Sequence, residues 1–206
     1  MKMLAVLTSA KKPSAALLKE NGGIVIREDV SGRPHSVSLM PLVDELLCEN
    51  GIDVSDIDLF AVDVGPGSFT GVRIGVSIVN AMAYALGKPV IEVPSLCALR
   101  HLADKNDTVV TMLDARNGNG YAAAFRGGEC IFDPCACVQK EIVETYGEGA
   151  EFIGDCRGRT DQCDAKLVIL EAQSLIAKSG DGCETASAVP LYLRPSQAER
   201  MKKTDN

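Results

Sequence analysis

The chain has 206 residues, of which 46% are hydrophobic and 24% are charged, so it is long enough to bury a core as one domain or as two lobes. Its net charge of −7 and its pI near 4.9 argue against a protein that grips a nucleic-acid backbone unaided. The apolar run after Lys2 stops at Thr8, and no stretch approaches the roughly 18 apolar residues of a membrane span. We therefore expect a cytoplasmic chain that does not enter a membrane.

The eight cysteines could belong to a metal site or be ordinary reduced thiols. None of them forms a C-x-x-C pair, and His35 and His101 lie far in sequence from the group Cys130, Cys135 and Cys137. Because zinc sites usually show such pairs, the pattern favours free thiols in a reducing compartment and predicts no metal.

Short apolar runs bounded by turn residues predict the elements of the first half of the chain. The expected order is strands at 3–7, 14–19 and 23–29, a helix at 38–49, a strand at 59–64, a helix at 70–86, a strand at 90–93 and a short helix from 95 to about 103. Ser95 is a suitable N-cap for the last helix. Such an order predicts a mixed sheet with helices packed on it, as in one lobe of the actin and sugar-kinase type of ATPase.

The polar segment 104–107 is the expected boundary between an N-terminal lobe at 1–103 and a smaller C-terminal lobe at 104–206. Beyond it, the predicted elements are strands at 108–113, 121–125 and 130–132 and one helix at about 170–178. The second lobe repeats the strand, hairpin and strand that open the first lobe, and then becomes irregular. The predicted fold class is α/β, an actin-like ATPase (ASKHA, ribonuclease H-like) fold with mixed sheets and a reduced second lobe.

The most informative stretch is the run Gly-Pro-Gly-Ser-Phe-Thr-Gly-Val-Arg-Ile-Gly at 65–75, which joins an apolar strand to a long apolar helix. In a phosphate-binding use, backbone amides near Gly65 and Gly67 face an anion, and the hydroxyl of Ser68 or Thr70 caps the helix. The lysine of a P-loop is absent, and Arg73 is the nearest cation. The residues that would face a phosphate are Thr8, Ser9, Gly65, Gly67, Ser68 and Arg73.

In a packing use, the same stretch lets a helix approach a neighbour closely, because Gly71 and Gly75 lie four residues apart on one face. The helix that follows is apolar nearly all round, and a sheet can cover only one side of it. Another helix, from this chain or from a partner, would cover the other side. The residues of this predicted two-helix surface are Leu39, Met40, Val43, Leu47, Gly71, Gly75, Ile78, Val79 and Met82. The alternative is that all of them face the chain's own sheet.

The glycine-rich run resembles the signature of the bacterial TsaB (YeaZ) family. Three further stretches agree with that family in order and spacing, and they are His35-Ser36 ahead of 39–47, Leu113-Asp114-Ala115-Arg116, and Pro190-Leu191-Tyr192-Leu193-Arg194-Pro195. The resemblance covers essentially the whole chain and is weakest between about 133 and 188. It implies an actin-like fold and a role in making threonylcarbamoyladenosine on tRNA.

The resemblance also bears on catalysis, because TsaB proteins resemble TsaD, the threonylcarbamoyltransferase itself. TsaD proteins hold a metal with a His-x-x-x-His pair, and Ser95 and Leu99 stand at those positions here. The TsaB family usually reads Asp-Thr-Ser where this chain has Leu7, Thr8 and Ser9, so a Mg²⁺-positioning carboxylate is missing. We expect no catalytic residue, no metal and no cofactor in the isolated chain, while weak nucleotide binding stays open.

Asp114 and Arg116 follow the end of a predicted strand, where sheets with helical layers often carry functional polar groups. One interpretation is a polar pair in the cleft between the lobes. The other is a hairpin in which Asp114 accepts backbone hydrogen bonds and Arg116 is solvated.

The predicted function is that of a non-catalytic partner of TsaD, bound through the helices at 38–49 and 70–86. The resemblance implies a TsaE-type ATPase in the same assembly, tRNA contact through the complex, and pairing of two copies when TsaD is absent. One alternative is a nucleotide-dependent transferase or metalloprotease-like enzyme that acts alone. A structural interaction protein outside tRNA modification is a weaker third possibility.

Overall fold

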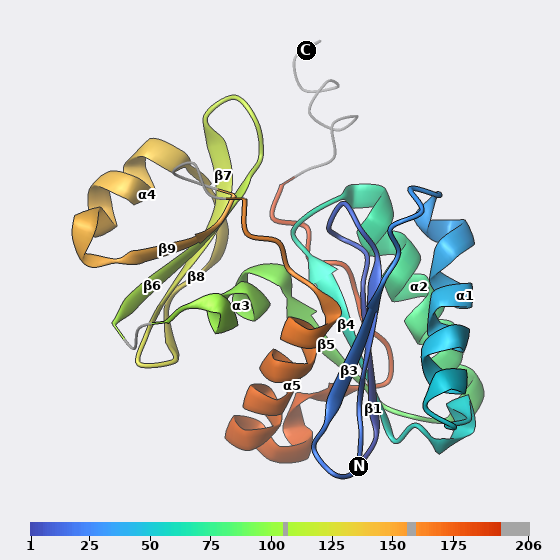
Figure 1. Cartoon of the computed structure of the whole chain (residues 1–206). Coiled ribbons are helices and arrows are strands. Elements are labelled where there is room, and N and C mark those ends of the chain that lie inside the picture. The colour runs from blue at the N-terminus through green and yellow to red at the C-terminus, as the bar shows by residue number, and fades with distance from the viewer. Residues whose placement is uncertain (105–106, 156–159, 195–206) are drawn as a thin grey trace.

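The computed structural model describes residues 1–104, 107–155 and 160–194. Two sheets lie side by side, each with its own helices (Figure 1). The six-stranded sheet has the order β10-β5-β4-β1-β2-β3, formed by β1 (Met3–Leu7), β2 (Ser14–Leu18), β3 (Ile24–Glu28), β4 (Leu59–Gly65), β5 (Val90–Pro94) and β10 (Glu184–Thr185). The four-stranded sheet has the order β8-β7-β6-β9, formed by β6 (Thr108–Asp114), β7 (Asn119–Arg126), β8 (Glu129–Val138) and β9 (Glu151–Gly154).

The first sheet is mixed, as predicted, and β1 lies at its centre. β1 pairs antiparallel with β2 and parallel with β4, and β4 pairs parallel with β5. Helices α1 (His35–Glu49) and α2 (Phe69–Leu86) cover one face, and α5 (Ala165–Ser179) covers the other (Figure 1). Side chains of β1 alternate between the two cores, so the whole strand is buried.

Helix boundaries in the first half differ from the predicted ones where the caps differ. α1 begins at His35, directly after Pro34, three residues earlier than predicted. The Ser68 hydroxyl caps α2 by accepting a hydrogen bond from the Gly71 amide at 3.2 Å, so this expected capping hydroxyl is confirmed. The Ser95 prediction was wrong: Pro94 precedes α3 (Ser95–Leu99), and the Ser95 hydroxyl is bonded elsewhere.

The second half departs further from the prediction. Its sheet gains β9, a β8 of ten residues where three were expected, and α4 (Gln139–Tyr146), which was not predicted. β8 continues through Pro134 because it is an edge strand, whose outward groups need no partner. α4 spans only eight residues and buries one of them, Ile142, so it is too short to stand out in the sequence.

The predicted boundary at 104 does separate the two sheets, but the chain does not stay in the second lobe. After β9 it returns, and α5 packs on β1 and β2 while β10 pairs with β5. The helix predicted near 170–178 is α5, and it therefore belongs to the first sheet's core rather than to a C-terminal lobe. Its apolar pattern predicted a helix but could not show which sheet it covers.

α2 spans 18 residues, about the predicted length, but it does not fit the expectation that no stretch approaches the length of a membrane span. Among the described residues it is the helix long and apolar enough to cross a membrane by length and composition, a test that core helices of soluble proteins also pass. Only 33% of it is buried, through an inward stripe that includes Val72, Val76 and Val79. Ile74, Ile78, Met82 and Leu86 pack against the same core while partly buried, and the exposed apolar residues of the helix are Phe69, Ala81, Tyr84 and Ala85.

Candidate functional site

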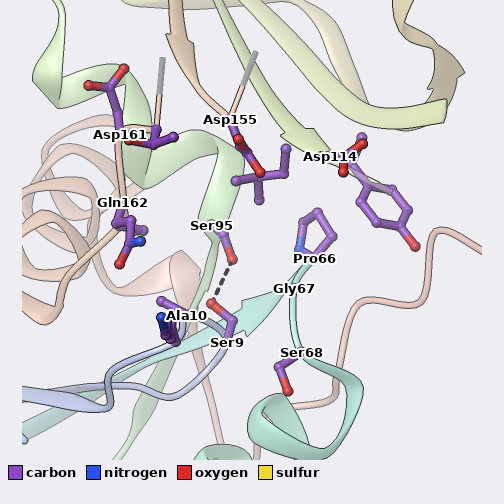
Figure 2. A pocket seen from close by; sticks show the side chains of 15 residues that line it. Ser9, Ala10, Pro66, Gly67, Ser68, Ser95, Asp114, Asp155, Asp161 and Gln162 are labelled. Atoms are coloured by element: carbon purple, nitrogen blue, oxygen red, sulfur yellow. Dashed lines mark hydrogen bonds between the residues drawn. The ribbon is translucent and has the colours of Figure 1, made fainter. Parts of the chain in front are cut away.

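A cleft of about 330 Å³ lies between the two sheets (Figure 2). One wall comes from the turn after β1, the glycine-rich turn after β4 and the start of α3, and the other comes from β6, β7 and the segment that follows β9. Its lining residues are Ser9, Ala10, Lys11, Pro66, Gly67, Ser68, Ser95, Leu113, Asp114, Tyr121, Asp155, Thr160, Asp161, Gln162 and Cys163. Of the residues predicted from sequence, the cleft brings together Ser9, Gly67, Ser68 and Asp114.

The floor of the cleft is a buried chain of hydroxyl and carboxyl groups. The Ser9 and Ser95 hydroxyl oxygens lie 3.4 Å apart (Figure 2), and the Ser95 hydroxyl donates to Asp63 Oδ1 at 2.5 Å. The Gly65 amide donates to the same oxygen at 3.1 Å. Asp63 is fully buried, and its Oδ2 has no hydrogen-bond partner among the described residues. Burial raises the pKa of this carboxyl, so the cleft rests on an acid whose ionised form is disfavoured by its surroundings.

The glycines beside the cleft make close packing within this chain. A Cβ on Gly67 would lie 2.6 Å from Cβ of Ser9, and one on Gly71 would lie 2.0 Å from the carbonyl oxygen of Thr8. A Cβ on Gly75 would lie 2.3 Å from Oγ1 of Thr8, which itself donates to the Gly71 carbonyl at 2.6 Å. The predicted close approach is correct, but it joins α2 to Thr8, the residue directly after β1, rather than to a partner.

Three of the six predicted phosphate-facing residues do not line the cleft. Thr8 is buried against α2 and does not line the cleft. Gly65 is buried in a left-handed conformation with φ of +92°, and its amide is used by Asp63. Arg73 lines a different groove on the outer side of α2.

The wall opposite the hydroxyl groups carries three carboxylates, Asp114, Asp155 and Asp161 (Figure 2). Asp114 Oδ1 accepts from the Arg116 amide at 2.9 Å and from the side chain of Gln139 at 2.8 Å. Arg116 is exposed in the left-handed conformation and does not line the cleft, so only half of the predicted pair is there. Because Lys11 is the one basic residue in the described lining, the cleft carries an excess of negative charge.

Positions that the TsaD resemblance assigns to metal ligands are apolar or already bonded here. Ser95 is held by Asp63, and Leu99 is fully buried in the core. Within residues 1–104, 107–155 and 160–194, no group of three or more His, Cys, Asp or Glu side chains is placed to share a metal ion. Burial raises the pKa of the nearby Cys97 thiol to about 12, which keeps it in the neutral form that binds metals poorly.

Arg73 forms a second polar feature, on the outside of the molecule. Its guanidinium carbon lies 3.9 Å from the centroid of the Phe69 ring and 5.5 Å from that of Tyr192. Its Nε donates to the Tyr192 hydroxyl at 2.7 Å. The groove of about 440 Å³ beside it is lined by Ser36, Phe69, Thr70, Arg73, Ile74, Ser77 and Ile78.

The predicted two-helix surface divides into a buried and an exposed part. Six of its residues are buried, namely Leu39, Val43, Leu47, Gly71, Gly75 and Val79, so the structure places them in the chain's own core. Met40 is 46% exposed, and Ile78 and Met82 are half-buried. The apolar period of each helix found its inner face, and the outer face is the one that remains free.

Sequence reasoning did not find Asp63 or the aromatic neighbours of Arg73. A lone aspartate inside the apolar run of β4 was a usable signal, because a buried carboxyl needs a partner. No local signal could place Tyr192 against Arg73, since 119 positions separate them.

A family model described as "TsaD: tRNA N6-adenosine threonylcarbamoyltransferase" matches residues 5–146, which is more than half of the chain. The TsaB protein of Haemophilus influenzae is 35% identical over 122 residues, which are 58% of this chain and 51% of that protein. The TsaB protein of Escherichia coli is 33% identical over 132 residues, which are 63% of this chain and 57% of that protein. The chain belongs to the TsaB (YeaZ) family.

The match to a solved structure covers more of this chain than the matches to the curated TsaB proteins do. The crystal structure of YeaZ from Pseudomonas aeruginosa superposes with a TM-score of 0.78 at 28% identity, covering 93% of this chain and 99% of that one. The predicted actin-like α/β fold is therefore confirmed. The matches to curated TsaB relatives are shorter and span only about half of their length.

The C-terminal part of the TsaB-like pattern runs beside α2. The Leu191 amide donates to the Val64 carbonyl at 2.8 Å. The Asn80 side chain donates to the Ala188 carbonyl at 2.9 Å and accepts from the Ala188 amide at 2.8 Å. These contacts place Tyr192 against Arg73. Pro195, the last residue of that motif, lies outside the described residues.

Proposed function

We propose that the chain is a non-catalytic partner of a TsaD-type protein in forming N6-threonylcarbamoyladenosine next to the anticodon of tRNA. The observation that carries the proposal is the outer face of α2. In 18 residues this helix has one charged side chain, Arg73, although seven of those residues are exposed. A helix that faced only water would carry many charges, so the composition supports a protein partner on this face.

The surface continues from α2 onto α1. Val37 and Met40 of α1 are 56% and 46% exposed, and Phe69 and Tyr84 of α2 are 44% and 89% exposed. Large apolar side chains exposed on two adjacent helices favour docking of another helical surface. The half-buried Ile78 and Met82 would complete the contact.

The cleft supports the non-catalytic part of the proposal. Leu7, at the position of the family's carboxylate, is fully buried and can hold no Mg²⁺-bound water. The carboxylates of the opposite wall repel the phosphates of a nucleotide, so binding there would be weak and would depend on an accompanying cation.

The wider assembly follows from the family. We propose that a TsaE-type ATPase joins this chain and TsaD in the cytoplasm, that tRNA is bound by the complex, and that two copies of the chain pair when TsaD is absent. The TsaB and TsaD names of its relatives support the TsaD-type partner alone.

Reconstitution tests the function directly. TsaD-type and TsaE-type proteins of the same organism are incubated with tRNA, ATP and the threonylcarbamoyl donor, with and without this chain, and the modified nucleoside is measured by mass spectrometry. We expect modification only when the chain is present. Equal modification without it would overturn the proposal.

The rival, an enzyme that acts alone, predicts different behaviour of the isolated chain. It requires ATP turnover and a bound metal in the pure protein. Isothermal titration with Mg-ATP, a phosphate-release assay and elemental analysis separate the two. Turnover by the isolated chain would replace the partner hypothesis with the enzyme.

A further inference from the structure

We propose that Arg73 anchors a carboxylate carried by an apolar helix of the partner protein. The site is the groove between the start of α1 and the first turns of α2. The inference rests on the proposed function, because the partner is the TsaD-type protein named there. It adds what that partner presents, which is an Asp or Glu side chain on an otherwise apolar helix.

The guanidinium group is held in place and yet has one edge free. Phe69 covers a face of it, and the Tyr192 hydroxyl takes the Nε hydrogen bond. Among the described residues, no hydrogen bond or ion pair involves its two terminal nitrogens. A guanidinium fixed in this way loses little rotamer entropy when its free edge binds a carboxylate, which it can do through two parallel bonds.

The support for Arg73 exists before any partner arrives. Tyr192 lies on the segment that Asn80 clasps at Ala188 and that Leu191 ties to β4. The Phe69 and Tyr192 ring centroids are 5.4 Å apart, so the two rings and the guanidinium form one cluster. The segment that carries Tyr192 packs on the start of α2, so the Arg73 guanidinium is held in place without a partner.

The surroundings of Arg73 select for a carboxylate on an apolar surface. The groove lining contains apolar side chains and hydroxyl groups, and Arg73 is the one charged residue among the described lining. Further along the outer side of α2, Ser77, Ala81, Tyr84 and Ala85 are exposed and uncharged. A docking helix would shield the Arg73 charge from water and strengthen its attraction to a carboxylate.

A protein fits this site better than a nucleic acid does. Binding a phosphate backbone relies on several cations, whereas this groove has one and the chain carries a net charge of −7. Arginine, tyrosine, phenylalanine and methionine are the residues enriched at protein interfaces, and the outer face offers all four.

The test measures the affinity of the full chain for the purified TsaD-type protein of the same organism by isothermal titration. We expect Arg73→Ala to weaken binding by about 10- to 100-fold, as the loss of a charge-assisted hydrogen bond does. The affinity of Arg73→Lys should lie between those of the wild type and Arg73→Ala, because lysine keeps the positive charge but lacks the planar guanidinium group. Tyr192→Phe should weaken binding by about 3-fold, since the ring stays but the Nε partner is lost.

Two controls separate the anchor from general effects of charge and folding. Lys140→Ala removes an exposed positive charge from α4, far from the groove, and should leave the affinity unchanged. Raising the salt concentration should weaken the wild-type complex more than the Arg73→Ala complex, because only the former contains the ion pair. Thermal unfolding of each variant checks that the exposed substitutions leave the fold intact.

A double-mutant cycle identifies the partner's group. Each exposed Asp or Glu on the partner's docking helix is changed to Ala and combined with Arg73→Ala. Coupling at one carboxylate supports the inference, and coupling at none overturns it. If Arg73→Ala binds the TsaD-type protein with wild-type affinity, the anchor is overturned and the proposed function still stands. The same holds if the variant loses only self-association or tRNA retention. Failure of the wild-type chain to bind TsaD would overturn the proposed function and the anchor together.

Discussion

The interlobe cleft and the outer face of α1 and α2 differ in what their polar groups are bonded to. In the cleft, Ser95 and the Gly65 amide are bonded to Asp63, and Asp114 is bonded to its own hairpin and to Gln139. On the outer face, apolar side chains are exposed and Arg73 keeps a free edge. The polar groups of the cleft are thus bonded largely within the chain, whereas the outer face exposes apolar side chains and one arginine edge that the proposed partner would cover.

Both regions depend on the same helix. The inner side of α2 carries the glycines that let it lie against Thr8, and this close packing forms the floor next to the cleft. The outer side carries the exposed stripe. A substitution on the inner side therefore tests folding, and one on the outer side tests association.

The largest expected effect is on folding. Gly71→Ala places a methyl group against the Thr8 carbonyl, a backbone atom that cannot turn away. We expect the free energy of unfolding to fall by about 3 kcal/mol or more, measured by urea denaturation. Gly149→Ala, whose Cβ would meet nothing within 4 Å, is the matched control and should change stability little. A stable Gly71→Ala protein would contradict the close-packing role.

The next effect is on association. Met40→Glu puts a charge into the proposed apolar contact and should weaken binding to the TsaD-type protein by about 30- to 300-fold in a pull-down or titration. Ile131→Glu is a matched control, because Ile131 is equally exposed, at 46%, on β8 of the other sheet. Equal losses in both variants would mean that the outer face of α1 and α2 has no special part in pairing.

A smaller effect concerns the buried carboxyl of the cleft. Burial raises the native pKa of Asp63 above its unfolded value near 4, so the native state binds the extra proton. The stability that Asp63 contributes is fully present below pH 4 and is lost as the pH rises through the native pKa.

The variant Asp63→Asn cannot ionise, and Asn Oδ1 can still accept from Ser95. Its stability relative to the wild type should therefore rise by about 1 kcal/mol or more between pH 4 and pH 8, measured by urea denaturation at each pH. Asp44→Asn, an exposed aspartate of α1, provides the comparison. A relative stability that stays flat with pH would mean that Asp63 is ionised in the native protein throughout.

The smallest expected effect tests the charge of the cleft. Asp155→Asn removes an exposed carboxylate from the acidic wall and should raise the affinity for ADP by about 2- to 5-fold. Isothermal titration with ADP measures it, with Asp133→Asn on β8, outside the described cleft lining, as control. An unchanged affinity would show that the carboxylates do not govern nucleotide binding here.

Local patterns in the sequence predicted the first and last residues of most helices and strands in the first half of the chain to within a few positions. The continuous apolar run of β1 reflects burial on both of its faces, and the helical period of α1 and α2 reflects burial on one side. The same period misled us about function, because Leu39, Val43 and Val79 are the inner residues of their helices. Ser95 misled us in another way, since its hydroxyl bonds to a residue 32 positions earlier instead of capping its helix.

Local sequence patterns were enough to predict the family, the strand–helix order and the place where the glycine-rich turn meets a helix. These features depend on interactions between residues that are close in sequence. The return of α5 to the first sheet, the packing of Gly71 and Gly75 on Thr8 and the support of Arg73 by Tyr192 could be seen only in the folded chain. Each of these contacts joins segments separated by about 60 to 150 positions, and the register at which such segments meet is set by packing of the whole core.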